Sequence, residues 1–108
     1  MVERNDNLSL DRGFYLEPRC VALRERFGND GFAFYYFILS MMCYSDDFLF
    51  PVTDQTSEII SEQMGISLER YFEILEYCFE LDLFEKEIYD NERVLVSTEY
   101  ESVNVSYL

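Results

Sequence analysis

A nearly continuous apolar run from Phe32 to Tyr44 is the feature that most constrains how this chain can fold. Its thirteen residues are interrupted only by Ser40. A helix that spans a membrane needs about 20 apolar residues, so this run is too short to cross a bilayer. An apolar helix outside a membrane has to be buried on most sides. The run therefore predicts a central core helix from about Gly31 to Tyr44, which Asn29-Asp30 can cap.

The 108 residues are enough for one domain of ordinary size, and an apolar share of 49% is enough for a real core. Residues 1–12 are polar and are predicted to be loose. Residues 13–97 are predicted to form the domain, followed by a tail over residues 98–108. The alternation of apolar residues in this tail fits an extended segment or a peptide that docks on a partner. The N-terminus has no apolar signal core, which favours a cytoplasmic protein.

The charge of the chain is strongly asymmetric. Its net charge is −14, from 8 basic and 22 acidic residues. Residues 1–26 hold five of each kind, whereas residues 27–108 hold seventeen acidic and three basic residues. Non-specific binding to DNA needs Lys and Arg to displace counterions from phosphates. This composition therefore argues against direct DNA binding and favours a basic protein partner, although the acidity could equally serve solubility.

The residue types exclude several classes of chemistry. The chain contains no His, which rules out Ser-His and Cys-His nucleophilic arrangements and removes the commonest zinc ligand. Cys20, Cys43 and Cys78 are far apart and lie in apolar helical patterns, which predicts buried reduced thiols as in a cytosolic protein. Asp46-Asp47 and Asp54 offer oxygen ligands, but their spacing matches no calcium loop. We expect no enzymatic activity, metal or cofactor.

Helix and strand signals divide the part of the chain before residue 53. Pro18 is favoured at the first position of a helix, and Gly28 is well placed to end that helix. After the apolar run, Phe48–Val52 reads as a short extended strand. Pro51 cannot donate a backbone hydrogen bond, so this strand is expected at an edge or an end of a sheet.

Two helices with a tight connection are predicted next. Thr53 or Asp54 caps the first helix, which runs to Met64. Gly65-Ile66-Ser67 forms the connection, since Gly closes helices and Ser caps them. The second helix extends over residues 68–81. This pair is a candidate helix-turn-helix.

The chain then predicts a β-hairpin, from residues 83–89 and 93–97 with a polar turn over residues 90–92. A helix-turn-helix followed by a hairpin is a winged helix, and the early strand would complete its small sheet. The predicted fold class is mainly α, or α+β: a winged helix-turn-helix with four helices and a C-terminal hairpin as the wing.

The second helix of the predicted pair carries a stripe of carboxylates about 16 Å long on one face. The stripe is formed by Glu69, Glu73, Glu76 and Glu80. The apolar residues assigned to the opposite side are Leu68, Phe72, Leu75 and Phe79. Like charges at this spacing do not stabilise an isolated helix. The stripe is therefore either a solvated face or a contact surface.

Acidic residues on the neighbouring elements favour a contact surface. They occupy positions that a winged helix normally offers to phosphate, on the preceding helix and in the wing. They are Glu58, Glu62, Glu85, Glu87, Asp90 and Glu92. Together with the stripe, these ten carboxylates are the predicted partner-binding residues.

Several short segments resemble the N-terminal winged-helix domain of phage replisome-organiser proteins, which are related to DnaD-type initiation factors. The segments are Phe14-Tyr15-Leu16, Val21-Ala22-Leu23-Arg24, Arg26-Phe27-Gly28, Asp30-Gly31-Phe32, Glu62-Gln63-Met64-Gly65-Ile66-Ser67, Leu83-Phe84-Glu85-Lys86-Glu87, Val94-Leu95 and Ser97. The likeness covers roughly residues 10–97. It implies a phage or prophage protein in a bacterial host cell, in a family whose members usually continue into a C-terminal region that binds DNA or replisome proteins. This chain stops after the wing, so it is expected to be stand-alone.

Two functions fit these observations. In the first, the chain is an acidic inhibitor that imitates DNA and blocks a basic nucleic-acid-binding groove of a host defence nuclease, as anti-CRISPR and anti-restriction proteins do. That comparison rests on charge and context, since no motif is shared. In the second, the chain is a replication-initiation module that contacts replisome subunits, or DNA through its N-terminal arginines. These arginines are Arg4, Arg12, Arg19, Arg24 and Arg26.

A homodimer is also compatible with the sequence. Phe48, Phe50 and the tail could supply an exposed apolar edge for it.

Overall fold

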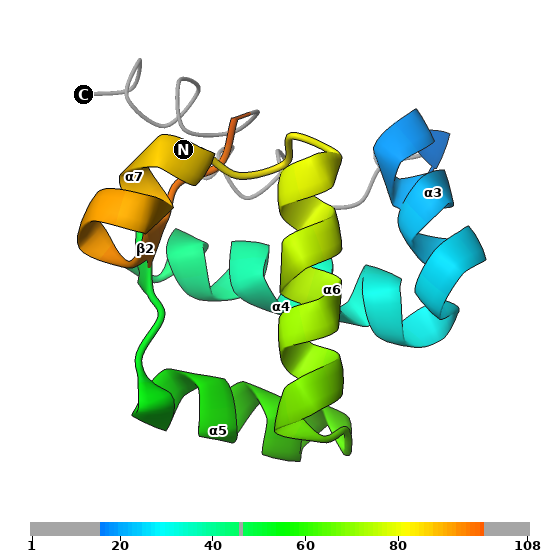
Figure 1. The fold of residues 1–108 in the computed structure, drawn as a ribbon, viewed down its shortest axis with the longest axis horizontal. Coiled ribbons are helices and arrows are strands. Elements are labelled where there is room, and N and C mark those ends of the chain that lie inside the picture. Colours follow the sequence, from blue (N-terminus) through cyan, green and yellow to red (C-terminus); the bar gives the residue numbers. More distant parts are fainter. Residues whose placement is uncertain (1–15, 46, 99–108) are drawn as a thin grey trace.

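The computed structural model describes residues 16–45 and 47–98, and these residues are mainly helical (Figure 1). The helices are α3 (Pro18–Phe27), α4 (Asn29–Cys43), α5 (Asp54–Met64), α6 (Leu68–Glu80) and α7 (Lys86–Glu92). The strands are β1 (Phe50–Pro51) and β2 (Val94–Leu95), which pair antiparallel. The coarse prediction of a mainly helical α+β fold is confirmed. The described residues form five helices, one more than the four predicted.

Helix α4 is the central helix, as predicted. Its side chains Phe34, Ile38, Leu39 and Met42 are fully buried, and α6 lies across it (Figure 1). The predicted cap by Asn29-Asp30 is wrong, because α4 begins at Asn29 without a side-chain capping bond. None of the described helices is long and apolar enough to cross a membrane.

Local capping signals set the ends of α5 and α6. Thr53 Oγ1 accepts a hydrogen bond from the Thr56 backbone N–H, and Thr56 Oγ1 accepts one from the Thr53 backbone N–H, which closes a capping box. Gly65 ends α5 in the left-handed conformation at φ 71°, and Ser67 caps α6 through the Arg70 N–H. The predicted connection over residues 65–67 is confirmed.

The predicted β-hairpin is wrong, because most of its first strand is a helix. Residues 86–92 form α7, where Lys86 and Asp90 pair one turn apart at 2.8 Å. Tyr89 is buried against Phe79 of α6, with ring centroids 4.8 Å apart. The helix ends at Arg93, which has left-handed φ and whose N–H donates to the Tyr89 carbonyl. Burial of an aromatic side chain thus outweighs the β propensity of the local sequence.

Short antiparallel pairings hold the ends of this region together. Phe50 is paired with Leu95, and Phe84 forms an isolated bridge with Ser97. The segment after α6 therefore lies beside residues 96–98, and residues 94–95 lie beside β1. Residues 84 and 97 are paired, and the chain between them contains α7 where a turn was expected.

Two residues of the apolar edge predicted for a homodimer are buried. Phe48 and Phe50 are 6% and 3% exposed and belong to the core. The loose N-terminal segment over residues 1–12 lies outside the described residues. The predicted tail also lies outside them, apart from Thr98, whose N–H donates to the Leu83 carbonyl.

The three cysteines differ in burial. Cys20 and Cys78 are buried, while Cys43 is half-buried, and all three are thiols. Burial raises the pKa of the Cys78 thiol, which keeps it in the unreactive protonated form. The prediction of buried reduced thiols is confirmed for Cys20 and Cys78.

This difference predicts an order of alkylation. In the native protein at pH 8, iodoacetamide should modify Cys43 first, because the reaction needs an accessible thiolate. In urea, all three cysteines should react at similar rates. Mass spectrometry of timed samples checks both results. Native modification of Cys78 as fast as that of Cys43 would contradict the packing of α6 against the core.

Candidate protein-interaction surface

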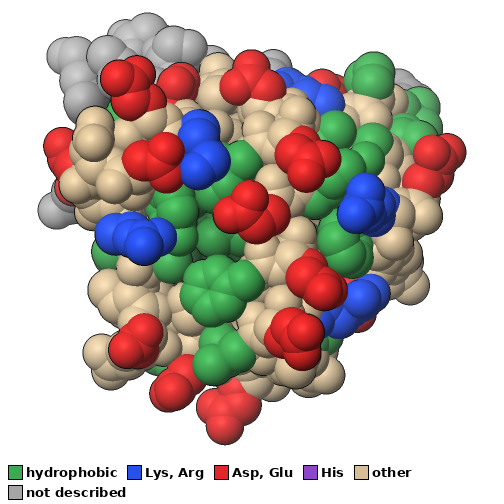
Figure 2. All heavy atoms as spheres, in the orientation of Figure 1, with side chains coloured by type: hydrophobic (Ala, Val, Ile, Leu, Met, Phe, Trp, Pro, Cys, Tyr) green, Lys and Arg blue, Asp and Glu red, His purple; other side chains and the backbone are tan. Residues whose placement is uncertain are grey.

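The predicted acidic residues lie at the surface of three consecutive helices. Glu85 is half-buried at the start of α7, and the other nine are exposed: Glu58, Glu62, Glu69, Glu73, Glu76, Glu80, Glu87, Asp90 and Glu92. They belong to α5, to α6, and to α7 with its N-cap. Figure 2 shows carboxylates spread over one face of the molecule, with fewer basic side chains between them. We call these ten residues the acidic face.

Helix α6 is rotated relative to the predicted orientation. Its buried side is formed by Tyr71, Ile74, Leu75 and Cys78. Two residues assigned to the inner side, Leu68 and Phe72, are 41% and 40% exposed, so the predicted orientation is wrong for them. Phe79 is half-buried.

The geometry of an α-helix explains the error. At about 100° per residue, Phe72 lies only about 70° from the middle of the glutamate stripe, whereas Tyr71 and Cys78 lie almost opposite it. The stripe is therefore flanked by exposed apolar side chains. A helical projection whose exposed side is centred on the four glutamates places Phe72 beside them, and it needs only the sequence.

A cleft of about 330 Å³ lies on the other flank of the stripe, between the end of α3 and α6. Its lining consists of Arg26, Phe27, Glu73, Glu76, Tyr77 and Glu80. The Arg26 guanidinium lies 4.8 Å from the centroid of the Tyr77 ring and 5.6 Å from that of Phe27. Arg26 thus packs on aromatic rings beside three carboxylates of the stripe, a favourable place for a cation.

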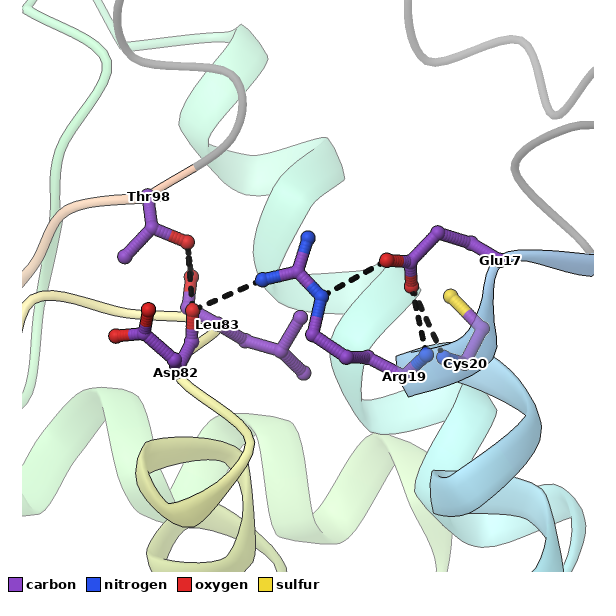
Figure 3. Close-up of polar contacts among 6 residues, drawn as sticks. All are labelled: Glu17, Arg19, Cys20, Asp82, Leu83 and Thr98. Atoms are coloured by element: carbon purple, nitrogen blue, oxygen red, sulfur yellow. Dashed lines mark hydrogen bonds and ion pairs between the residues drawn. The ribbon is translucent and has the colours of Figure 1, made fainter.

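Arg19 and Arg24, two of the arginines proposed to contact DNA, make contacts within the protein. The Arg19 Nε donates to Glu17 at 2.8 Å, and its Nη1 donates to the Asp82 carbonyl at 3.0 Å. Thr98 donates to the same carbonyl, so this network joins the start of α3 to the segment after α6 (Figure 3). Arg24 lies over the Phe32 ring. Arg4 and Arg12 lie outside the described residues.

The three basic residues after residue 26 are also engaged. Arg70 Nε binds Asp30 at 3.1 Å, and Arg93 donates to the Tyr89 hydroxyl. The hydrogen bond to Asp90 raises the pKa of Lys86, whose ammonium group also lies over the Phe79 ring. Arg70 is thus paired with a carboxylate outside the acidic face, whereas Lys86 pairs with Asp90 of that face. Arg93 keeps its charge, because the Tyr89 hydroxyl is neutral.

The structure describes only Asp47 of the acidic pair before β1. Asp46 lies outside the described residues, and a hydrogen bond from Ser45 lowers the pKa of Asp47. Within residues 16–45 and 47–98, no group of three or more Cys, Asp and Glu residues is arranged to hold a metal ion.

Comparison with known protein families shows to which family the chain belongs. The model of the Lin1244/Lin1753-like N-terminal domain matches residues 8–100. The chain belongs to this family. The match includes every described helix and strand of the Lin1244/Lin1753-like domain, and so the whole acidic face. No curated protein and no solved structure matches the chain.

Proposed function

We propose that this Lin1244/Lin1753-like domain is a non-enzymatic, acidic protein-binding module. It is a phage-encoded inhibitor that acts in the cytoplasm of the bacterial host. Its acidic face imitates the phosphates of DNA and blocks a basic nucleic-acid-binding groove of a host defence nuclease, of the anti-CRISPR or anti-restriction type. The mechanism is steric occlusion, with association that is fast and sensitive to salt.

One observation carries this proposal. Nine exposed carboxylates lie on α5, α6 and α7, and in the ion pairs of the described residues only one of them, Asp90, is paired with a base, Lys86. A surface of this kind repels nucleic acid and attracts the Lys and Arg residues that bind it.

A second candidate function is a replication-initiation module that binds replisome proteins or DNA. The strand pairings support it. Strand β1 precedes α5 and α6, and residues 84 and 97 follow them in the chain. Residue 50 pairs with residue 95, and residue 84 pairs with residue 97. This order and these pairings are the ones expected of a winged helix. We propose that the fold is a winged helix whose wing contains α7, related to the DnaD-like replisome-organiser domains.

Binding to duplex DNA separates the two functions. The inhibitor should not change the mobility of a 30-base-pair duplex in 50 mM or 150 mM salt, because we expect the acidic face to repel the phosphates of the duplex. It should prevent a purified defence nuclease from binding its DNA substrate. Low-micromolar DNA binding that weakens with salt would overturn the inhibitor proposal in favour of the replication module.

Charge reversal tests the stripe directly. The triple variant Glu73→Lys, Glu76→Lys and Glu80→Lys should weaken inhibition of the nuclease at least tenfold, because it replaces attraction by repulsion. The variant should remain folded, as far-UV circular dichroism can check, since these three side chains are exposed and lie outside the core.

The matched control changes the net charge by the same amount at exposed positions outside the acidic face. It is Glu25→Lys, Asp47→Lys and Asp54→Lys. This control should retain inhibition within about threefold, because screening limits the effect of distant charges. Equal loss in both variants would mean that net charge matters and the stripe does not.

A further inference from the structure

Leu68 and Phe72 expose apolar surface beside the glutamate stripe of the acidic face. They are one helical turn apart on α6 and are 41% and 40% exposed. Side chains four residues apart are neighbours on a helix, so the two form one patch. Figure 2 shows hydrophobic side chains among the carboxylates on this face. We call Leu68 and Phe72 the α6 apolar patch.

The patch has a defined shape. The Phe72 ring meets the Tyr71 ring edge to face, with centroids 4.9 Å apart, and Tyr71 is fully buried. The Tyr71 ring in turn meets the Phe34 ring of α4 at 5.1 Å. A chain of aromatic contacts therefore ties the exposed ring to the core, and a fixed aromatic surface loses little conformational entropy when a partner covers it.

Carboxylates border the patch without being neutralised. Glu69 and Glu73 follow its residues on α6, and neither side chain forms an ion pair with another described residue. Arg70 is the nearby base. Its guanidinium binds Asp30 and lies 5.3 Å from the Phe27 ring centroid, on the side of α3. The patch and its border thus combine apolar surface with negative charge.

Imitation of phosphates does not account for the exposed Leu and Phe side chains. We propose that the α6 apolar patch docks a cationic amphipathic segment of the protein partner, in which one or two apolar side chains are flanked by Lys and Arg. The apolar side chains cover Leu68 and Phe72, and the basic ones meet Glu69 and Glu73. This inference rests on the proposed function and specifies its partner: a basic surface that also offers apolar anchors.

Two synthetic peptides test the inference by fluorescence anisotropy. The first is an 18-residue amphipathic helix made of Leu and Lys, and the second has the same Lys positions with Ser in place of Leu. In 150 mM salt the Leu/Lys peptide should bind at least tenfold more tightly than the Ser/Lys peptide. The double variant Leu68→Ser, Phe72→Ser should remove this difference and leave binding of the Ser/Lys peptide unchanged.

The control variant is Met41→Ser on α4. Met41 is 44% exposed, an exposed fraction close to that of Leu68 or Phe72 taken singly, so its substitution removes exposed apolar surface from another helix. This variant should bind both peptides as the unmodified protein does. Circular dichroism melts confirm that all variants are folded at the assay temperature.

Each other outcome has a separate meaning. Equal binding of both peptides, or equal loss in the Met41 control, overturns the docking inference and leaves the acidic-face proposal standing. Failure of both peptides to bind even in 20 mM salt overturns the proposed function as well. If the unmodified protein elutes as a dimer and the double variant as a monomer, a second copy covers the patch and the inference is overturned.

Discussion

Replacement of Phe84 by Ala is expected to lower the free energy of unfolding by about 4 kcal/mol. Phe84 is fully buried and makes edge-to-face contacts with Tyr35 of α4, at 5.8 Å, and with Phe79 of α6, at 6.3 Å. Its backbone forms the bridge to Ser97. Removal of the ring leaves a cavity where the central helix, α6 and the segment that leads into α7 meet.

Urea denaturation followed by circular dichroism measures this loss. Phe72→Ala is the matched control, since it removes the same ring from a position that is 40% exposed. The control should cost about 1 kcal/mol, because less apolar surface returns to water and no closed cavity forms. Similar losses in the two variants would contradict the burial of Phe84 at this junction.

The features that the sequence predicted correctly depend on neighbouring residues. The connection between α5 and α6 needs only Gly65, which adopts a left-handed φ, and Ser67, which caps α6. The central helix follows from a single apolar run. Both signals lie within one element, so no knowledge of the rest of the fold is required.

The errors arose where distant residues decide the structure. Residues 83–89 have β-prone side chains, but Tyr89 is buried against Phe79 only when residues 86–92 are helical. Arg70 reaches Asp30, 40 residues away in the chain, so the sequence could not show that this base turns toward α3. Local propensity is a weak guide when tertiary contacts of this kind compete with it.

The candidate site was predictable in part. Exposure of the glutamates on α6 follows from their spacing on one helix face. The helical angle also places Phe72 beside the glutamates, whereas a prediction that puts all the apolar residues on the inner side misplaces it. The aromatic side of the cleft was not predictable, because it forms only when Phe27 of α3 and Tyr77 of α6 meet, with ring centroids 5.8 Å apart.

Gly31→Ala is expected to destabilise the protein by about 2 to 3 kcal/mol, although Ala normally stabilises the interior of a helix by about 1 kcal/mol relative to Gly. A Cβ atom at Gly31 would lie 2.6 Å from the Leu23 carbonyl oxygen and 3.0 Å from the Phe27 Cβ. The carbonyl belongs to the backbone of α3 and cannot turn away as a side chain could. Relief of the collision therefore requires α3 and α4 to move apart.

Gly65→Ala provides the control for this substitution. Gly65 has φ 71° and open space around its Cβ position, so Ala there meets only backbone strain of about 1 to 2 kcal/mol. Urea denaturation should rank Gly31→Ala as the more costly change, despite its ordinary helical backbone. Because α3 carries Arg26 and Phe27, its displacement should also widen the cleft beside the glutamate stripe. A Gly31→Ala protein that is as stable as the unmodified one would refute the close approach of α3 and α4.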